Sequence, residues 1–371
     1  MNTKTTAGLT FDIRPSSDVI PAARRADILA SPGFGQVFTD HMVRIRWTED
    51  SGWHDARLEA YGPLTLDPAT SVFHYAQEIF EGLKAYRQAD GSIVAFRPHA
   101  NAARFRRSAR RMAMPELPDE LFVKAIEVLV AHDRDWVPAE LGNSLYLRPF
   151  MIATQRGLGV NSPSSSYEFL VIASPAAAYF SGGVRPVTVW LSEDYTRATP
   201  GGTGEAKCGG NYAAAFAGQR QAVENGCDQV VWLDAVERRW IEEMGGMNLF
   251  FVHNSGAQAR LVTPALTGAL LPGITRDSLL KLAPDMGLPT EESRISVEQW
   301  RSGSESGELT EVFACGTAAV ITPVGRVRSA SGEWVINSGE PGPVTLRLRE
   351  ELLGIQYGQR PDPYGWIHKI C

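Results

Sequence analysis

The sequence GGTGEAKCGGNY, residues 201–212, places a single lysine between two groups of glycines. A phosphate-binding P-loop requires the pattern G-x-x-x-x-G-K-S/T, whereas Ala206 precedes this lysine and Cys208 follows it. A nucleotide-binding loop is therefore disfavoured. Lys207 suits another chemistry, because a lysine amine becomes a nucleophile when burial or a nearby positive charge keeps it neutral. Its small neighbours would also let a flat cofactor lie against the backbone.

Pyridoxal phosphate is the aldehyde cofactor that amino-acid enzymes bind to a lysine as an imine. The chain has six lysines, at positions 4, 84, 124, 207, 281 and 369. Two of these are near the termini, and Lys124 and Lys281 lie on expected helices with ordinary surface explanations. Lys84 and Lys207 remain. An exposed loop lysine and a cofactor-binding lysine are equally open interpretations of Lys207 at this point.

The cofactor needs a carboxylate that keeps its pyridine nitrogen protonated and a donor for its phenolic oxygen. Glu242 and Glu243 precede two glycines in WIEEMGGMN (240–248). Adjacent residues on a strand face opposite sides, so only one of the two glutamates can reach the ring. A solvated pair at a turn is the alternative interpretation. Tyr212 follows Lys207 by five residues and can supply the donor.

The phosphate of the cofactor needs a helix N-terminus and an arginine. LLPGITRDSLL (270–280) supplies a helix start at which Gly273 permits close approach of the backbone. Free amides and the helix dipole attract phosphate at such a position. NAARFRRSARR (101–111) offers several arginines, although most arginines on one helix belong to a solvated face. An uncomplicated helix start is the alternative interpretation of the first segment.

Composition excludes several other classes of protein. A length of 371 residues favours two domains, and 44% hydrophobic with 21% charged residues indicates a folded chain. With 36 Lys+Arg against 42 Asp+Glu the net charge is -6, and no basic run suggests nucleic-acid binding. No apolar run approaches the roughly 20 residues of a membrane span, and the polar start is not a signal peptide. We therefore expect a cytoplasmic protein without a membrane or nucleic-acid partner.

The cysteines and histidines give no sign of a metal site or a disulfide framework. The four cysteines are widely spaced without a C-x-x-C pair, and the seven histidines form no H-E-x-x-H or similar ligand pattern. We expect no catalytic metal.

Periodicity predicts a mixture of strands and helices in both halves of the chain, which implies an α+β or α/β class. In the first half, the initial forty residues look irregular, and strands are expected over 41–47, 92–96, 144–152 and 167–175, with helices over about 98–112 and 119–133. In the second half, strands are expected over 187–191, 229–234, 249–253, 259–264 and 311–317, with helices over 211–224, from about 276, and over 344–354.

The helix expected over 119–133 has one clear apolar face, made of Leu121, Phe122, Ala125, Ile126, Leu129 and Val130. The small and glycine-rich residues 176–186 form the expected interdomain loop. We therefore expect a smaller N-terminal α/β domain over 1–178, of which 1–35 is irregular, and a larger C-terminal domain over 187–371.

Six segments together resemble one family of enzymes. KCGGNY, EEMGGMN, LLPGITR, HYAQEIFEGLKAYR, LYLRP and EVFACGTAA are similar to the motifs of the branched-chain amino acid aminotransferases, which belong to the fold-type IV group of pyridoxal-phosphate enzymes. The similarity runs in the order and spacing of the family from about Gly33 to Gly358. It implies a two-domain fold-type IV structure with pyridoxal 5′-phosphate as cofactor, and a larger C-terminal domain that carries the Schiff-base lysine.

The resemblance implies a role for individual residues. Lys207 would be the Schiff-base lysine and the catalytic proton carrier. The cofactor would be bound by Lys207, Arg104, Tyr212, Glu243, Ile274, Thr275 and Thr317, with Glu243 rather than Glu242 at the pyridine nitrogen. The substrate would be bound by Phe34, Tyr75, Phe80, Tyr146, Arg148, Tyr179 and Ala318. Ordinary core packing is the alternative for one or two of the aromatic residues. Tyr75 would cross a subunit interface, which implies a homodimer.

The resemblance also implies the reaction, a reversible transfer of an amino group between leucine, isoleucine or valine and 2-oxoglutarate. One pocket must then accept apolar side chains and the carboxylate of glutamate. An arginine at its rim, Arg148, can pair with that carboxylate and otherwise stay hydrated. The alternatives are D-amino-acid aminotransferase, aminodeoxychorismate lyase, or a catalytically silent relative of the same fold.

The chain departs from mammalian members of the family at two places. Those members have a threonine where this chain has Gly246, so a hydroxyl near the cofactor is absent or replaced by water. They also have a redox-active C-x-x-C where this chain has Ala319 and Thr322. Cys315 lies before that position and cannot replace either cysteine, so we expect no redox switch of that kind.

Overall fold

A computed structural model describes residues 9–177 and 184–371, and these residues form two compact units. The first unit comprises residues 9–177, Ala206–Gly209 and Ile355–Cys371, and the second comprises residues 184–205 and Gly210–Gly354. Each unit combines one large sheet with helices, so the expected mixed α+β class is confirmed.

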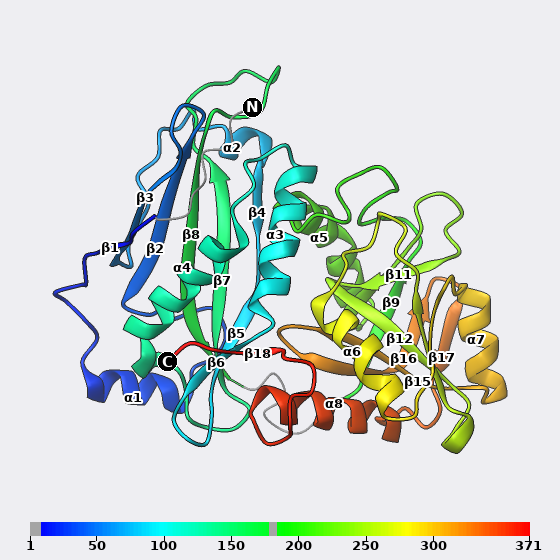
Figure 1. Cartoon of the computed structure of the whole chain (residues 1–371). Coiled ribbons are helices and arrows are strands. Elements are labelled where there is room, and N and C mark those ends of the chain that lie inside the picture. The colour runs from blue at the N-terminus through cyan, green and yellow to red at the C-terminus, as the bar shows by residue number, and fades with distance from the viewer. Residues whose placement is uncertain (1–8, 178–183) are drawn as a thin grey trace. The chain divides into compact units, whose positions relative to one another are not determined.

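The first unit is built on a nine-stranded sheet with the order β1-β3-β2-β8-β7-β5-β6-β18, and β4 pairs with β7 beside this path (Figure 1). Its pairs are antiparallel except for the parallel pair β1–β3. The strands are β1 (Asp12–Ile13), β2 (His41–Thr48), β3 (Gly52–Ala60), β4 (Glu78–Phe80), β5 (Leu83–Arg87), β6 (Ile93–Phe96), β7 (Ser144–Ala153), β8 (Ser166–Ala176) and β18 (Ile367–Lys369).

The core of the first unit lies between this sheet and two helices that cover one of its faces (Figure 1). The helices of the unit are α1 (Ala22–Ala30), α2 (Val72–Tyr75), α3 (Pro98–Arg111) and α4 (Asp119–His132). Phe105 of α3, Phe122 of α4 and Phe169 of β8 form a buried aromatic cluster with ring centroids 5.4–5.9 Å apart. The whole apolar face expected for α4 is buried, as its periodicity predicts.

The second unit contains a ring of six strands. Its sheet has the order β11-β10-β9-β16-β15-β12-β13-β14, and an additional pairing of β11 with β12 closes the first six strands on themselves. The strands are β9 (Val187–Ser192), β10 (Gln229–Leu233), β11 (Ile241–Met244), β12 (Met247–His253), β13 (Arg260–Pro264), β14 (Thr290–Ser293), β15 (Leu309–Gly316), β16 (Val320–Ser329) and β17 (Gly332–Val335).

The helices associated with the second unit are α5 (Gly209–Glu224), α6 (Ile274–Asp285), α7 (Val297–Ser306) and α8 (Pro343–Gln356). Ser296 and Gln299 start α7 with a capping box, in which each side chain accepts the other residue's backbone N–H. Trp300 on this helix is fully buried and packs edge-on against Phe251 and Trp334. α7 thereby covers one side of the strand ring.

Several elements differ from the sequence-based expectation. The first forty residues contain α1 and β1, because their few apolar side chains, such as Ile28 and Leu29, pack on the core of the first unit. The sequence does not predict α7, since Trp300 and Ser304 are its buried residues and give too little periodicity. α6 begins at Ile274 rather than near residue 276. Part of the expected interdomain loop 176–186 lies outside the described residues.

The segment that carries Lys207 belongs to the first unit rather than to the larger C-terminal part of the chain. Its backbone explains why: Phe80 N–H donates to the Lys207 carbonyl at 2.9 Å, and Lys207 N–H donates to the Ser108 hydroxyl at 3.0 Å. The C-terminal residues join the same unit because β18 pairs with β6. The expected division at 178–187 is thus corrected at these two segments.

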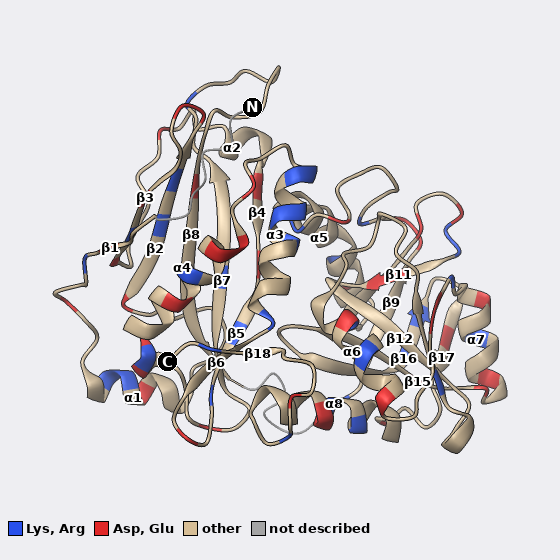
Figure 2. Ribbon diagram, viewed as in Figure 1, with Lys and Arg blue, Asp and Glu red and all other residues tan. Residues whose placement is uncertain are grey.

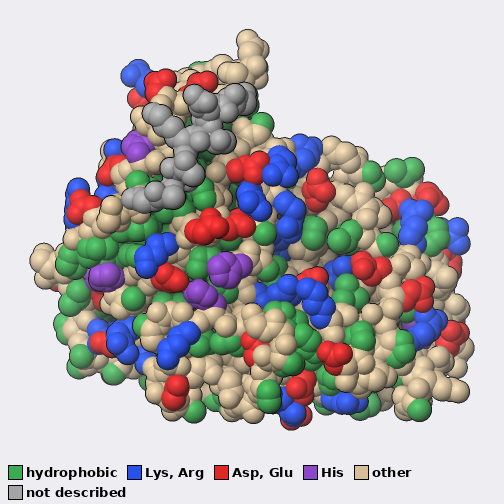
Figure 3. Space-filling view, viewed as in Figure 1, with side chains coloured by type: hydrophobic (Ala, Val, Ile, Leu, Met, Phe, Trp, Pro, Cys, Tyr) green, Lys and Arg blue, Asp and Glu red, His purple; other side chains and the backbone are tan. Residues whose placement is uncertain are grey.

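The surface of the protein is mixed in charge. Acidic and basic side chains are interspersed over the face shown in Figure 3. Within residues 9–177 and 184–371, no helix is both long enough and apolar enough to cross a bilayer.

The buried face of α4 yields a test of the packing. Leu129 of α4 is fully buried, whereas Leu141 is 63% exposed in the same unit. Leu129→Ala should lower the free energy of unfolding by about 2–5 kcal/mol, because it removes buried methyl groups and leaves a cavity. Leu141→Ala is the matched control and should change it by less than about 0.5 kcal/mol. Urea denaturation followed by tryptophan fluorescence measures both, and equal losses would contradict this packing.

Candidate functional site

Lys207 lies in a short segment that the first unit holds from three sides. Besides the bonds to Phe80 and Ser108, Gly209 N–H donates to the carboxylate of Glu78. The Lys207 ammonium nitrogen lies 4.7 Å from the centroid of the Phe80 ring. The lysine is half-buried, and its neighbours Ala206 and Cys208 are buried. The backbone of Lys207 is therefore fixed, as a residue with a positioned amine requires.

Arg104 is buried in α3 and is held by a glutamate that sequence analysis missed. Its guanidinium donates to both oxygens of Glu81, at 2.7 and 2.8 Å, and Asn101 donates to the same carboxylate at 2.7 Å. Burial alone would raise the pKa of Glu81, but the charge and hydrogen bonds of Arg104, with the charge of Lys207, lower it overall. Glu81 is thus an anion that orients Arg104.

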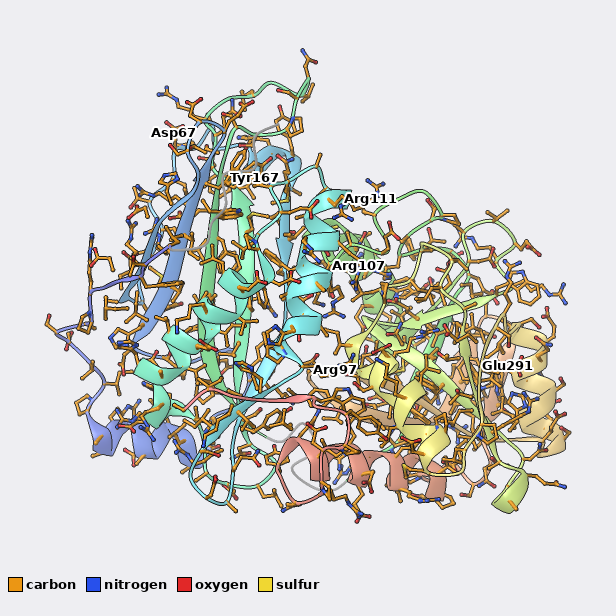
Figure 4. All side chains as sticks on the ribbon, viewed as in Figure 1. Asp67, Arg97, Arg107, Arg111, Tyr167 and Glu291 are labelled. Carbon is orange, nitrogen blue, oxygen red and sulfur yellow. The ribbon has the colours of Figure 1, made fainter. Side chains whose placement is uncertain are left out.

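The other arginines of α3 behave differently. Figure 2 shows basic side chains along this helix, and Figure 4 labels Arg107 and Arg111 on it. Arg107, Arg110 and Arg111 are exposed, whereas Arg104 is buried. The difference in burial separates Arg104 from its neighbours, as the resemblance implies.

Aromatic side chains surround Arg148 in β7. Its guanidinium carbon lies 4.8 Å from the Phe80 ring centroid and 5.5 Å from that of Tyr146. One terminal nitrogen donates to the Tyr146 hydroxyl at 3.3 Å. Phe34 packs edge-on against Tyr146, with ring centroids 5.1 Å apart, and is itself 51% exposed. Four of the expected substrate residues, Phe34, Phe80, Tyr146 and Arg148, therefore lie together.

Two further expected substrate residues of the N-terminal half lie apart from this group or outside the description. Tyr75 ends the short helix α2, is 42% exposed, and donates its hydroxyl to the Leu158 carbonyl at 2.6 Å. Tyr179 lies outside the described residues.

Glu243 lies in β11 of the second unit, where the ring of strands closes. It is 2% exposed, pairs with Asn248 in the β11–β12 ladder, and accepts the Leu271 N–H at 2.5 Å. Arg197 contacts its other oxygen, with 3.2 Å between the nitrogen and the oxygen. Arg197 is also buried, and sequence analysis gave no signal for it. The carboxylate is therefore held as an anion in a fixed orientation.

Glu242 is buried as well, which corrects the alternative of a solvated pair. It is 5% exposed, and its carboxylate makes no hydrogen bond or ion pair within the part of the chain that the structure describes. An irregular register between β10 and β11 occurs at this position. Burial, followed by the charge of Glu243, raises the pKa of Glu242 to about 7. The two glutamates thus differ in environment: the carboxylate of Glu243 is paired and that of Glu242 is not.

The turn after Glu243 brings Tyr212 close. Gly245 and Gly246 connect β11 to β12, and Gly245 has a φ of 57°, which favours glycine. A Cβ atom at Gly246 would lie 3.4 Å from the Tyr212 ring. A threonine at this position would therefore touch the tyrosine.

The expected phosphate-binding residues lie at two turns of the second unit. Ile274 and Thr275 open α6, whose N-cap is Gly273. A Cβ at Gly273 would overlap the Asn248 amide oxygen, so this close approach requires glycine. Thr317 and Ala318 lie half-buried in the β15–β16 turn, which ends at Val320 with a φ of 63°. A β-branched residue in this conformation is strained, a feature that is frequent at functional sites.

These residues fit the chemistry of pyridoxal phosphate within each unit. The first unit supplies an amine on a fixed backbone and a buried, oriented arginine. The second supplies a buried carboxylate held by an arginine and a helix start at a glycine, a combination that suits a pyridine nitrogen and a phosphate. Cys315 is buried, and burial raises the pKa of its thiol. All four cysteines are unpaired.

Comparisons with known proteins give one consistent result. The model of the family Amino-transferase class IV matches residues 78–327. A probable branched-chain-amino-acid aminotransferase of Streptomyces coelicolor is 60% identical over 98% of this chain and 99% of its own length. The branched-chain-amino-acid aminotransferase of Mycobacterium tuberculosis H37Rv is 59% identical over 99% of this chain and 100% of its own length.

Among solved structures, a branched-chain amino acid aminotransferase from T.th., crystallised with pyridoxamine 5′-phosphate, is similar to this chain. It has a TM-score of 0.72 and 30% sequence identity, and the match covers 88% of this chain and 98% of that one.

The unpaired glutamate yields a prediction about stability. Because the pKa of Glu242 is raised, the folded chain binds this proton more tightly than the unfolded chain does. Its contribution to stability is therefore complete below about pH 4 and is lost as the pH rises to about 7. Glu242→Gln should consequently raise Tm at pH 8, by roughly 2–4 °C for each kcal/mol regained, and change it little at pH 5.

Glu237→Gln is the matched control, because Glu237 is exposed in the neighbouring turn. Differential scanning calorimetry at the two pH values measures the effect. An equal shift of Tm at pH 5 and pH 8 for Glu242→Gln would contradict the raised pKa.

Proposed function

Since the chain belongs to the class IV aminotransferases, and among them to the branched-chain-amino-acid aminotransferases, we propose that it transfers the amino group of L-leucine, L-isoleucine or L-valine reversibly to 2-oxoglutarate. The products are the branched 2-oxo acid and L-glutamate. The observation that carries this proposal is the group of Phe34, Phe80, Tyr146 and Arg148, which combines apolar surface with one guanidinium.

Pyridoxal phosphate, the cofactor of this family, supplies an aldehyde that carries the amino group and a ring that accepts electrons from the substrate α-carbon. Lys207 would hold the cofactor through its amine and carry the proton between the α-carbon and C4′. Glu243 would keep the proton on the pyridine nitrogen, and the contact with Arg197 supports its anionic form. Tyr212 would donate to the phenolic oxygen.

The phosphate would be bound by Arg104, by Ile274 and Thr275 at the start of α6, and by Thr317. Glu81 supports this role of Arg104, because it fixes the guanidinium through two of its nitrogens. Ala318 would join the four clustered residues at the substrate, and so would Tyr179, which lies outside the described residues. We further propose a homodimer in which Tyr75 reaches the site of the partner subunit; its 42% exposure in one chain supports this.

An assay with a panel of substrates tests the proposed function. L-Leucine, L-isoleucine and L-valine should have values of kcat/KM within about a hundredfold of one another, since one methylene is worth only about 1–3 kcal/mol in an apolar pocket. D-Leucine is the control and should not react. Turnover of D-leucine instead would favour a D-amino-acid aminotransferase. No turnover of any amino acid would favour a lyase of the same fold or a silent relative.

Substitutions at Lys207 and Glu243 test their separate roles. Lys207→Ala should abolish transamination, because no other described side chain is proposed to move the proton. Glu243→Gln should retain the cofactor, seen by its absorbance, yet lower kcat by roughly a hundredfold or more, since binding and electron withdrawal are separate tasks. Retention of more than about 5% of the activity in Lys207→Ala would remove the lysine from the mechanism.

A further inference from the structure

Arg148 has an incompletely used guanidinium. Its Nε is buried and has no hydrogen-bond partner among the described residues, and one terminal nitrogen makes the 3.3 Å bond to Tyr146. The flat faces of its surroundings are the rings of Phe80 and Tyr146. A guanidinium so placed has donors in reserve for a carboxylate, which it can bind through two nitrogens.

Glu78 lies on the same face of the sheet as Arg148. In the antiparallel pair of β4 and β7, Phe80 lies opposite Phe150 and Glu78 lies opposite Ile152 (Figure 1). Directly opposed residues share a face, and so do residues two apart on one strand. Glu78, Phe80, Tyr146 and Arg148 therefore project from one side of the sheet.

Glu78 and Arg148 attract each other without forming an ion pair. Burial raises the pKa of Glu78, and the Gly209 N–H and the charge of Arg148 oppose this effect. The Glu78 carboxylate accepts the Gly209 N–H, but it contacts no arginine or lysine within 4.0 Å among the described residues. The glutamate is thus a nearby counter-charge that leaves the donors of Arg148 open.

This counter-charge addresses a difficulty of a site that takes two kinds of side chain. An apolar side chain displaces water from Arg148 and offers it no partner, which is unfavourable for an isolated cation. A negative charge nearby reduces that cost. A carboxylate on the ligand, in contrast, is repelled by the same negative charge and must compete with it for Arg148.

We propose that Glu78 is the resident counter-charge of Arg148 and that it sets the preference of the substrate site between apolar side chains and carboxylates. The inference rests on the proposed function, in which Arg148 receives the side-chain carboxylate of glutamate. Glu78 is a positioning residue in this account, since it acts on the substrate through Arg148.

Two non-reacting ligands of similar size isolate this effect from catalysis. Glutarate and 4-methylvalerate share one carboxylate and differ at the other end, where one has a second carboxylate and the other an isopropyl group. Isothermal titration of the holoenzyme with each ligand gives a ratio of the two dissociation constants. Glu78→Gln is the informative variant, because its amide oxygen still accepts the Gly209 N–H while the charge is removed.

Glu78→Gln should lower the Kd of glutarate relative to that of 4-methylvalerate by roughly two- to fivefold, the range of a half-exposed charge pair. Glu78→Ser, which removes the same charge with a smaller acceptor, should change the ratio in the same direction. Glu78→Asp keeps the charge and should keep the wild-type ratio. Glu59→Gln is the matched control: Glu59 pairs with Arg44 and Arg57 in β2 and β3, and its loss should leave the ratio unchanged.

An unchanged ratio in Glu78→Gln, or equal changes in both dissociation constants, would overturn the inference and leave the proposed function intact. The same change in Glu59→Gln would overturn it too, since the effect would then be general. Failure of the wild-type holoenzyme to bind either ligand would contradict the proposed function itself, and the inference with it.

Discussion

The fastening of residues 206–209 to the first unit is the constraint on which the site depends. Three backbone groups of this segment are bonded to Phe80, Ser108 and Glu78, which lie on a strand, a helix and a strand of that unit. The chain leaves the second unit for these four residues and then returns to it at Gly210. A lysine on a free loop would carry its amine through many orientations, whereas this backbone is fixed by the same elements that carry Phe80 and Arg104.

Buried charges are arranged around this constraint in pairs. Glu81 orients Arg104 in the first unit, and Arg197 holds Glu243 in the second. Burying an ion is costly unless a partner compensates it, so these pairs fix the geometry of the groups even where they add little stability. Glu242 is the exception, because its carboxylate is buried beside Glu243 without a partner among the described residues, and its pKa rises accordingly.

Much of the fold could be predicted from the sequence because its strongest signals are local. The apolar face of α4 and the runs that form β7 and β8 lie at nearly the expected positions. The order of the strands could not be predicted, since β18 joins β6 across more than 260 residues of sequence. The same reason hides the assignment of Lys207 to the first unit, which depends on hydrogen bonds to residues about 100 positions away.

The site shows the same division. Lys207, Glu243 and Arg104 could be chosen from motifs, but the residues that hold them, Glu81 and Arg197, left no local signal. Glu81 follows Phe80 within the segment HYAQEIFEG, yet nothing in its neighbours along the chain indicates that it binds Arg104. A partner in space is recognised from structure rather than from spacing in the chain.

The most direct test of the central claim, that Lys207 and Glu243 serve one amino-transfer chemistry, is an absorbance spectrum of the purified protein before and after L-leucine is added. The account predicts a yellow band of lysine-bound cofactor that shifts to the pyridoxamine form when leucine is added. A band that leucine leaves unchanged would contradict the substrate. No band after reconstitution with pyridoxal phosphate would contradict the account as a whole.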